Sequence, residues 1–259
     1  MSSRRPRRIG ARTGAAACTL LLLASCAKKN QVVQGECRPV NGADVCAWGE
    51  TAGATLVSFG ATVPVGAIEN APLDAPMVMP PVRAATIPLP EAVATATGFK
   101  TLTVYWEAHG HPPAPFMVPH FDFHFYTMTG AEVDVIDCAD STKAAQLPGT
   151  YQLPDIAIPG MGTLIGLCVP QMGMHALPAA DLSGTAPFQH SMVMGYYHGA
   201  SIFVEPMISR AALMERHSFD LDVPAVAGLP AGVHHPTHFR AEYDSTAQSY
   251  RFVFTGMAP

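Results

Sequence analysis

Residues 118–126 read VPHFDFHFY, a stretch in which titratable side chains alternate with phenylalanines. A β-strand sends successive side chains to opposite faces, so one face of this strand carries three phenyl rings. The other face carries His120, Asp122 and His124. Because the phenyl face must be buried, the His-Asp-His face lies on a rigid element beneath a packed layer. This pattern indicates a metal site or a proton-transfer site better than it indicates a solvated surface.

Strand-like runs continue on both sides of this stretch. The last two, residues 237–243 and 249–255, alternate charged with apolar side chains, as half-buried antiparallel strands do. Ser209 can cap a helix that we predict over residues 209–216. We therefore predict one mainly β domain, an antiparallel β-sandwich or open barrel with one short helix. The other candidate strands span residues 55–59, 61–68, 100–106, 118–127, 132–137, 162–169, 187–197 and 200–205.

The N-terminus resembles a bacterial export signal. Five arginines precede an apolar run from Ala15 to Ala24, which is too short to span a bilayer, since a span takes about 20 residues. The run ends in Leu23-Ala24-Ser25-Cys26, which matches the lipobox of bacterial lipoproteins. The resemblance implies cleavage before Cys26 and a diacylglycerol on its sulfur. The alternative is an ordinary secreted protein that is cut nearby, and the choice between Sec and twin-arginine export stays open.

These features predict a location in the cell envelope, with the chain anchored to a membrane through lipidated Cys26. Ala27 is not aspartate, which in a diderm host favours the outer membrane, facing the periplasm. We divide the chain into a signal at residues 1–25, a lipid-anchored tether at residues 26–47 and a β-rich domain at residues 48–259.

Composition argues against two classes of protein. Loss of the five signal arginines takes the formal charge from −5 to −10. An acidic chain with scattered cations has no footprint for phosphates, so we expect no nucleic-acid partner. No later segment has about 18 uninterrupted apolar residues, so we predict no membrane span after the signal.

The six cysteines divide by position. One leaves with the signal, and Cys26 is the predicted lipid site. The other four remain in an oxidising compartment, where we favour Cys37–Cys46 as a local disulfide and Cys138–Cys168 as a longer one. The rival interpretation is a metal site built from cysteines, but no Cys-x-x-Cys spacing supports it.

Two more side chains fit a metal site beside residues 118–126. Glu205 is a lone carboxylate that ends an apolar run, and a buried carboxylate needs a partner. His175 closes the run Met-Gly-Met-His at residues 172–175. The predicted ligands are therefore His120, His124, His175 and Glu205, with Asp122 as a ligand or as the acceptor for a ring N–H.

Strand geometry limits this ligand set. Residues four apart on a straight strand lie about 13 Å apart at Cα, so His120 and His124 share one ion only if the strand bends. Otherwise one histidine of the pair binds. We favour zinc, with copper, iron and manganese as alternatives. Three protein ligands and an open position would permit hydrolysis or hydration chemistry, although the sequence specifies neither the reaction nor the small-molecule substrate.

The rival interpretation has no metal. The chain would then be a non-enzymatic envelope lipoprotein, oligomeric or ligand-binding, whose histidines and carboxylates form a structural buried polar network. Whether His109, His111 or His190 belongs to the site stays open. The methionines at 172, 174, 192, 194 and 207 suggest either copper or flexible core filling.

Four motifs resemble those of a family of exported bacterial proteins that carry a domain of unknown function. They are GHPP at 110–113, PHFDFHFY at 119–126, MGMH at 172–175 and EPMI at 205–208. The resemblance covers roughly residues 50–255 and implies a β-rich fold, functional importance for these positions and, because one member forms rings, a homo-oligomer. It implies no reaction. Ala176 stands where members usually carry tryptophan, and Pro112 stands where they often carry glutamate.

Overall fold

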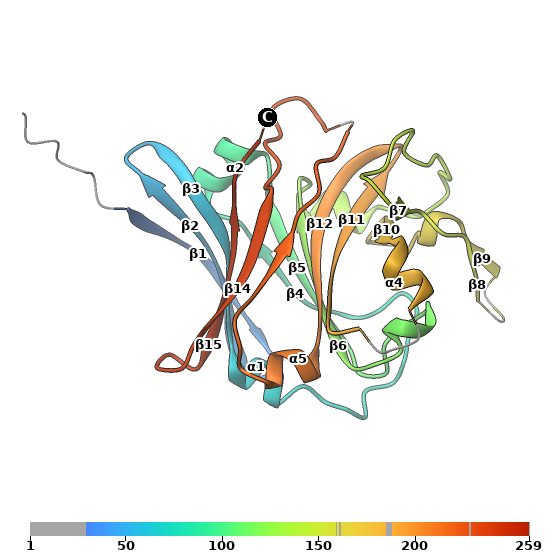
Figure 1. Ribbon diagram of the computed structural model, residues 1–259, viewed down its shortest axis with the longest axis horizontal. Coiled ribbons are helices and arrows are strands. Elements are labelled where there is room, and N and C mark those ends of the chain that lie inside the picture. The colour runs from blue at the N-terminus through green and yellow to red at the C-terminus, as the bar shows by residue number, and fades with distance from the viewer. Residues whose placement is uncertain (1–29, 159, 161, 185–187, 228, 259) are drawn as a thin grey trace, which may run out of the picture.

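The computed structural model describes residues 30–158, 160, 162–184, 188–227 and 229–258 (Figure 1). The predicted signal and the lipidation site Cys26 lie outside these residues. Two antiparallel sheets pack as a sandwich, which confirms the predicted fold class. The first sheet has the order β1 (Gln31–Val40), β2 (Ala43–Ala52), β3 (Thr55–Pro64), β15 (Ser249–Thr255), β14 (His238–Asp244) and β13 (Phe219–Asp222).

The second sheet carries the stretch with alternating histidines and phenylalanines at its centre. Its strand order is β4 (Arg83–Pro88), β5 (Thr101–Glu107), β6 (His120–Tyr126), β12 (Ala200–Ser209), β11 (His190–Tyr197), β10 (Met174–Pro178) and β7 (Tyr151–Gln152). A separate pair, β8 (Ile156–Ile158) and β9 (Gly162–Leu164), lies in the connection before β10. The predicted hairpin across His198-Gly199 is confirmed as β11 and β12.

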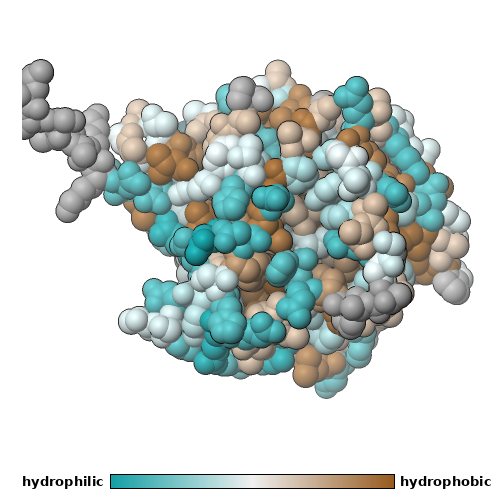
Figure 2. Space-filling model, in the orientation of Figure 1, coloured by the Kyte–Doolittle hydropathy of each residue, from teal (hydrophilic) through white to brown (hydrophobic). Residues whose placement is uncertain are grey.

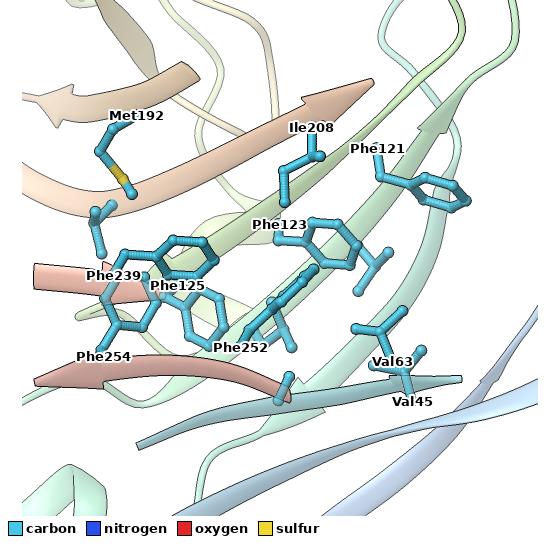
Figure 3. Packing of buried hydrophobic residues seen from close by; sticks show 14 of the residues in the cluster. Val45, Val63, Phe121, Phe123, Phe125, Met192, Ile208, Phe239, Phe252 and Phe254 are labelled. Carbon is cyan, nitrogen blue, oxygen red and sulfur yellow. The ribbon is translucent and has the colours of Figure 1, made fainter. Parts of the chain in front are cut away.

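The core lies between the two sheets. Phe121, Phe123 and Phe125 of β6 point into it (Figure 3). Phe123 meets Phe252 of β15, and Phe125 meets Phe254. Each of these rings is at most 1% exposed, and burying one phenyl side chain stabilises the fold by about 2–3 kcal/mol. The predicted burial of the phenyl face is therefore confirmed.

The opposite face of β6 is buried as well, because all seven residues of the strand are shielded from solvent. A second apolar cluster covers this face. It draws on the connections that contain Phe116, Val133 and Leu167, and it packs against Phe203 and Met207 of β12. The histidines and the aspartate of β6 therefore lie between two packed layers.

The predicted tether over residues 26–47 is wrong from Gln31 onward. Residues 31–40 and 43–52 form the hairpin β1–β2, which turns at Asn41-Gly42 and places Cys37 opposite Cys46. The polar composition of β1 reflects an edge strand that is mostly exposed. The disulfide Cys37–Cys46 is confirmed and staples this hairpin.

Short helices replace three predicted stretches of strand. Gly60 does not break β3, because it pairs with Val253 of β15 and Trp48 of β2. Glycine is required there, since a Cβ would lie 1.8 Å from the carbonyl oxygen of Phe252. The strand runs on to Pro64 and a helix follows. The predicted strand over residues 132–137 begins inside a helix, Gly130–Asp134, which a capping box of Thr129 and Glu132 starts, and residues 135–137 follow the helix. Residues 162–169 form β9 and a 3-10 turn, η2 (Ile165–Leu167).

The predicted helix after Ser209 is confirmed, and the Ser209 hydroxyl accepts a hydrogen bond from the amide of Ala212. One short helix was too few, since the described residues hold five α-helices of five to seven residues and a second 3-10 turn. None of these helices is long and apolar enough to cross a membrane. The helical elements are α1 (Val65–Glu69), α2 (Glu91–Thr97), η1 (Ala114–Phe116), α3 (Gly130–Asp134), α4 (Ala179–Ser183) and α5 (Arg210–Met214).

The second predicted disulfide, Cys138–Cys168, is also confirmed. It joins the segment after α3 to the residue after η2, and so fastens the layer that covers the polar face of β6. Polar residues cover much of the outer surface seen in Figure 2, with apolar residues showing between them.

Candidate metal centre

The polar face of the second sheet carries two groups of potential metal ligands. His124, His175 and Glu205 form one, which we call the Glu205 group. The other consists of His111, His120 and Asp122, and we call it the Asp122 group. Within each group the potential ligand atoms lie within 4.8 Å of one another.

Three strands build the Glu205 group. The pairing of Met207 with Asp122 and of Phe203 with Tyr126 places Glu205 of β12 opposite His124 of β6. His175 comes from β10, beyond β11, where its paired residue is Gly195. All of the group's side chains are buried, with exposures of 0% for His124, 7% for His175 and 1% for Glu205.

The ligand atoms of this group converge. His124 Nε2 lies 3.3 Å from His175 Nε2 and 3.4 Å from Glu205 Oε2. The third separation, from His175 Nε2 to Glu205 Oε2, is 3.9 Å. Ligands at 2.0–2.1 Å from a tetrahedral zinc ion lie about 3.3 Å from one another. The three atoms therefore have nearly the spacing of one face of such a site.

The backbone fixes the orientation of His175. Its Nδ1 lies 3.0 Å from the carbonyl oxygen of Leu167, which only accepts, so Nδ1 carries the proton and Nε2 presents a lone pair to the group. His124 Nδ1 and Glu205 Oε2 are buried without a hydrogen-bond partner. The hydroxyl of Thr103, on the residue that pairs with His124 across β5 and β6, is also unpartnered.

Burial favours the uncharged form of each residue in this group. It holds the pKa of His124 well below its usual value, and the nearby His175 lowers that pKa further. Burial also lowers the pKa of His175 to about 4. The pKa of Glu205 is raised well above its usual value by burial and by the charge of Asp122. Neutral imidazoles are the form that binds a metal, and a cation would offset the cost of ionising Glu205.

In the Asp122 group, as at His175, each histidine donates Nδ1–H to a backbone carbonyl. His120 Nδ1 donates to the carbonyl of Val118 at 2.7 Å, and His111 Nδ1 donates to that of Pro112 at 2.9 Å. Their Nε2 atoms face the two oxygens of Asp122, at 3.2 Å from Oδ1 for His120 and 3.7 Å from Oδ2 for His111.

Charge is concentrated in this second group. Burial alone would raise the pKa of Asp122, but His120 and His111 hold it far below its usual value. Burial alone would lower the pKa of His111, yet hydrogen bonding and attraction to Asp122 raise it to about 9.

Glu107, which the sequence analysis missed, adjoins the Asp122 group. It pairs with His120 across β5 and β6, is 6% exposed and has a buried oxygen without a partner. Burial raises its pKa to about 8, and the negative charge of Asp122 adds to the effect. The alternation along residues 101–107 could have revealed it, since Glu107 lies on the same face of the strand as the polar residues Thr101 and Thr103.

Both groups open onto one cavity. His111 and Asp122 line it from one group, and His175 and Glu205 line it from the other. The volume open to the centres of water molecules is about 30 Å³, which is room for about two waters. The remaining wall is formed by Met79, Pro81, Pro112, Ile158, Leu164, Leu167, Val169, Met172, Leu177, Val193 and Met207.

All five predicted ligands lie on this face, but the structure divides them. His120 and Asp122 belong to one group and His124 to the other, so the five do not converge on one point. Of the pair, only His124 lies with His175 and Glu205, which agrees with the alternative for a strand that does not bend. Strand spacing is the reason, because a strand without a sharp bend keeps residues four apart from converging. His111 joins the Asp122 group, whereas His109 is exposed and His190 stacks on Phe219 at 4.6 Å.

No protein-family model, curated protein or solved structure matches this chain. The family resemblance therefore stays a prediction.

Proposed function

We propose that the domain binds one divalent transition metal ion at the Glu205 group, with zinc favoured. The observation that carries the proposal is the convergence of three buried ligand atoms at separations of 3.3, 3.4 and 3.9 Å. These separations fit a common ion at ordinary ligand distances. Without a cation, the unpartnered Oε2 of Glu205 would cost about 1–3 kcal/mol.

The donor set suits zinc, with copper, iron and manganese as alternatives. Two imidazoles and one carboxylate are the ligands of many catalytic zinc sites, in which a fourth position stays open. An ion there would supply a Lewis acid and lower the pKa of a bound water, which is the chemistry of hydrolysis and hydration. The apolar wall of the cavity would restrict bulk water, and its small volume favours a small substrate or a small reacting group.

Metal analysis of the purified protein tests this proposal. The wild type should bind zinc at the Glu205 group, and Glu205→Gln should lose that ion while keeping its fold. His190→Ala is a matched control, since it removes a half-buried histidine from the same sheet outside both groups. Absence of bound metal in the wild type after exposure to all four metals, together with unfolding of Glu205→Gln, would favour a structural polar network instead.

We further propose that the chain is an envelope lipoprotein anchored through Cys26. Two disulfides support an oxidising compartment, and the lipobox at residues 23–26 supports lipidation. Fractionation of cells that express the full chain tests the anchor. The wild type should stay with the membranes, whereas Cys26→Ser should not be lipidated there. Equal membrane retention and equal mass of the mature forms would contradict the anchor.

A further inference from the structure

We propose that the Asp122 group is a second cation site, which binds a divalent transition metal through His111, His120 and Asp122. This inference goes beyond the proposed function, because its residues are distinct from those of the Glu205 group.

The hydrogen bonds of the two histidines leave their second nitrogens available. A backbone carbonyl only accepts, so the Nδ1 atoms of His120 and His111 carry the protons that they share with Val118 and Pro112. In the neutral ring, each Nε2 then presents a lone pair toward the carboxylate of Asp122. Histidines that bind metals usually donate their other ring N–H in this way, since it fixes the ring and raises its basicity.

The contact between His120 and Asp122 is unsatisfied unless a cation or a proton lies between the two atoms. The two atoms lie 3.2 Å apart, but neither His120 Nε2 nor Asp122 Oδ1 has a hydrogen-bond partner. Both residues are buried, with exposures of 0% and 3%. Two lone pairs at this distance repel, whereas two ligands of one tetrahedral ion lie at about 3.3 Å. His111 Nε2, at 3.7 Å from Asp122 Oδ2, is the third potential ligand atom of this site.

The local charge also suits a dication. Asp122 and Glu107 bring two carboxyl groups to this end of the sheet, and both are buried. Glu107 Oε1 has no hydrogen-bond partner. A cation between the imidazoles and Asp122 would stabilise negative charge on both carboxylates, and burying such charges unpaired is costly.

The site can be reached from the cavity. The side chain of His111 is 22% exposed, and it lines the cavity together with Asp122. The loop that carries it is held in place, since the amide of His111 donates to the carbonyl of Phe116 at 3.3 Å. Gly110 permits this fold-back, because its φ is +68° and a Cβ would lie 2.0 Å from the same carbonyl. The third ligand is therefore positioned by the backbone.

The alternative is an ion pair between protonated His111 and ionised Asp122, with His120 beside it. Such an ion pair would stabilise the fold but bind no metal. Loss of His111 should destabilise the protein whether the group binds a metal or forms a charged network, so thermal stability alone does not distinguish the two. Metal stoichiometry does.

The test is zinc content per chain in the full-length protein, in His111→Ala, in Glu205→Gln and in the variant that combines both. We expect two ions in the wild type, one in His111→Ala, one in Glu205→Gln and none in the double variant. His109→Ala is the control, because it removes an exposed histidine two residues from His111 and should leave two ions. Asp122→Asn replaces His111→Ala if that variant does not fold, and it should also leave one ion.

The outcomes separate the two sites. One ion in the wild type that persists in His111→Ala and Asp122→Asn would overturn the second site and leave the Glu205 site standing. One ion that persists in Glu205→Gln but is lost from His111→Ala would support the second site and overturn the proposed function. A wild type that binds no zinc, copper, iron or manganese would overturn both.

Discussion

At the scale of single residues, Gly195 affects the geometry of the candidate site because it has no side chain. A Cβ on Gly195 would lie 2.0 Å from the ring of Phe203, so only glycine leaves room for that ring over β11. The Phe203 ring in turn packs against His124 at 4.7 Å and His175 at 5.2 Å. Gly195 therefore helps to position both imidazoles of the Glu205 group without touching a ligand atom.

Gly195→Ala should displace the Phe203 ring and disturb the spacing of the two histidines. We expect a loss of about 1–3 kcal/mol in the free energy of unfolding and a weaker zinc affinity, measured by denaturant titration and by competition with a chelator. Gly184→Ala is the control, since a Cβ there meets only ordinary contacts at 3.5 Å or more. Unchanged zinc affinity in a destabilised Gly195→Ala protein would contradict the positioning role.

His235 provides a pH dependence outside the two ligand groups. Burial lowers its pKa from 6.5 to about 4, so the folded state resists its protonation more than the unfolded state does. The stability that this group contributes is present above pH 6.5 and is lost as pH falls toward 4. At a pH near 5 the loss amounts to about 2 kcal/mol.

The substitution His235→Gln should remove this part of the acid sensitivity. We expect the difference in free energy of unfolding between variant and wild type to shift in favour of the variant as pH falls from 7 to about 5. Denaturant melts of both proteins across that range measure it. A difference that stays constant with pH would show that His235 does not couple folding to protonation.

At the scale of secondary-structure elements, the sequence pattern of a segment predicted the features that depend only on the geometry of that segment. The alternation along β6 predicted the strand and the nature of both its faces, because the pleat alone imposes the period of two. It did not predict which residues of other strands would join each histidine. His111 joins a group and His190 does not, and that outcome depends on register and on loop paths across the whole sheet.

The errors in element assignment have related causes. β1 reads as a polar tether because an edge strand with one unpaired side needs few apolar residues. The helix α3 was missed because its capping box at Thr129 and Glu132 outweighs the strand-like valines and isoleucine that follow. The two disulfides were predictable from cysteine positions and compartment, since only three pairings of four cysteines exist.

The disulfide Cys138–Cys168 should position the site as well as stabilise the fold. Cys168 follows Leu167, whose carbonyl fixes the tautomer of His175. Replacing both cysteines with alanine should cost about 2–4 kcal/mol and weaken zinc binding. The double variant Cys37→Ala and Cys46→Ala is the control, since that bridge lies within the β1–β2 hairpin. Equal zinc affinity in the two double variants would contradict the positioning role.

At the scale of the whole molecule, the sheet that contains β6 lies between the core of the sandwich on one face and the second apolar cluster on the other. The inner face of that sheet supplies the phenyl core, and the outer face holds both ligand groups under a covering layer. Because its ligands come from β6, β10 and β12, an ion at the Glu205 group would link elements far apart in the sequence.

Zinc should therefore raise the stability of the whole domain. At a free zinc concentration of about 100 times Kd, we expect about 2.7 kcal/mol of added stability, seen as a rise in Tm of several degrees that a chelator reverses. Glu205→Gln should show a smaller rise, and His190→Ala should match the wild type. An identical Tm with zinc and with chelator in the wild type would contradict the coupling.

Anomalous diffraction from crystals soaked in zinc tests the central claim most directly. The Glu205 group should show an anomalous peak about 2.0–2.2 Å from His124 Nε2, His175 Nε2 and the carboxylate of Glu205. Crystals soaked in zinc, copper, iron and manganese that show no peak there, with His124 and His175 in direct hydrogen-bond contact, would contradict it.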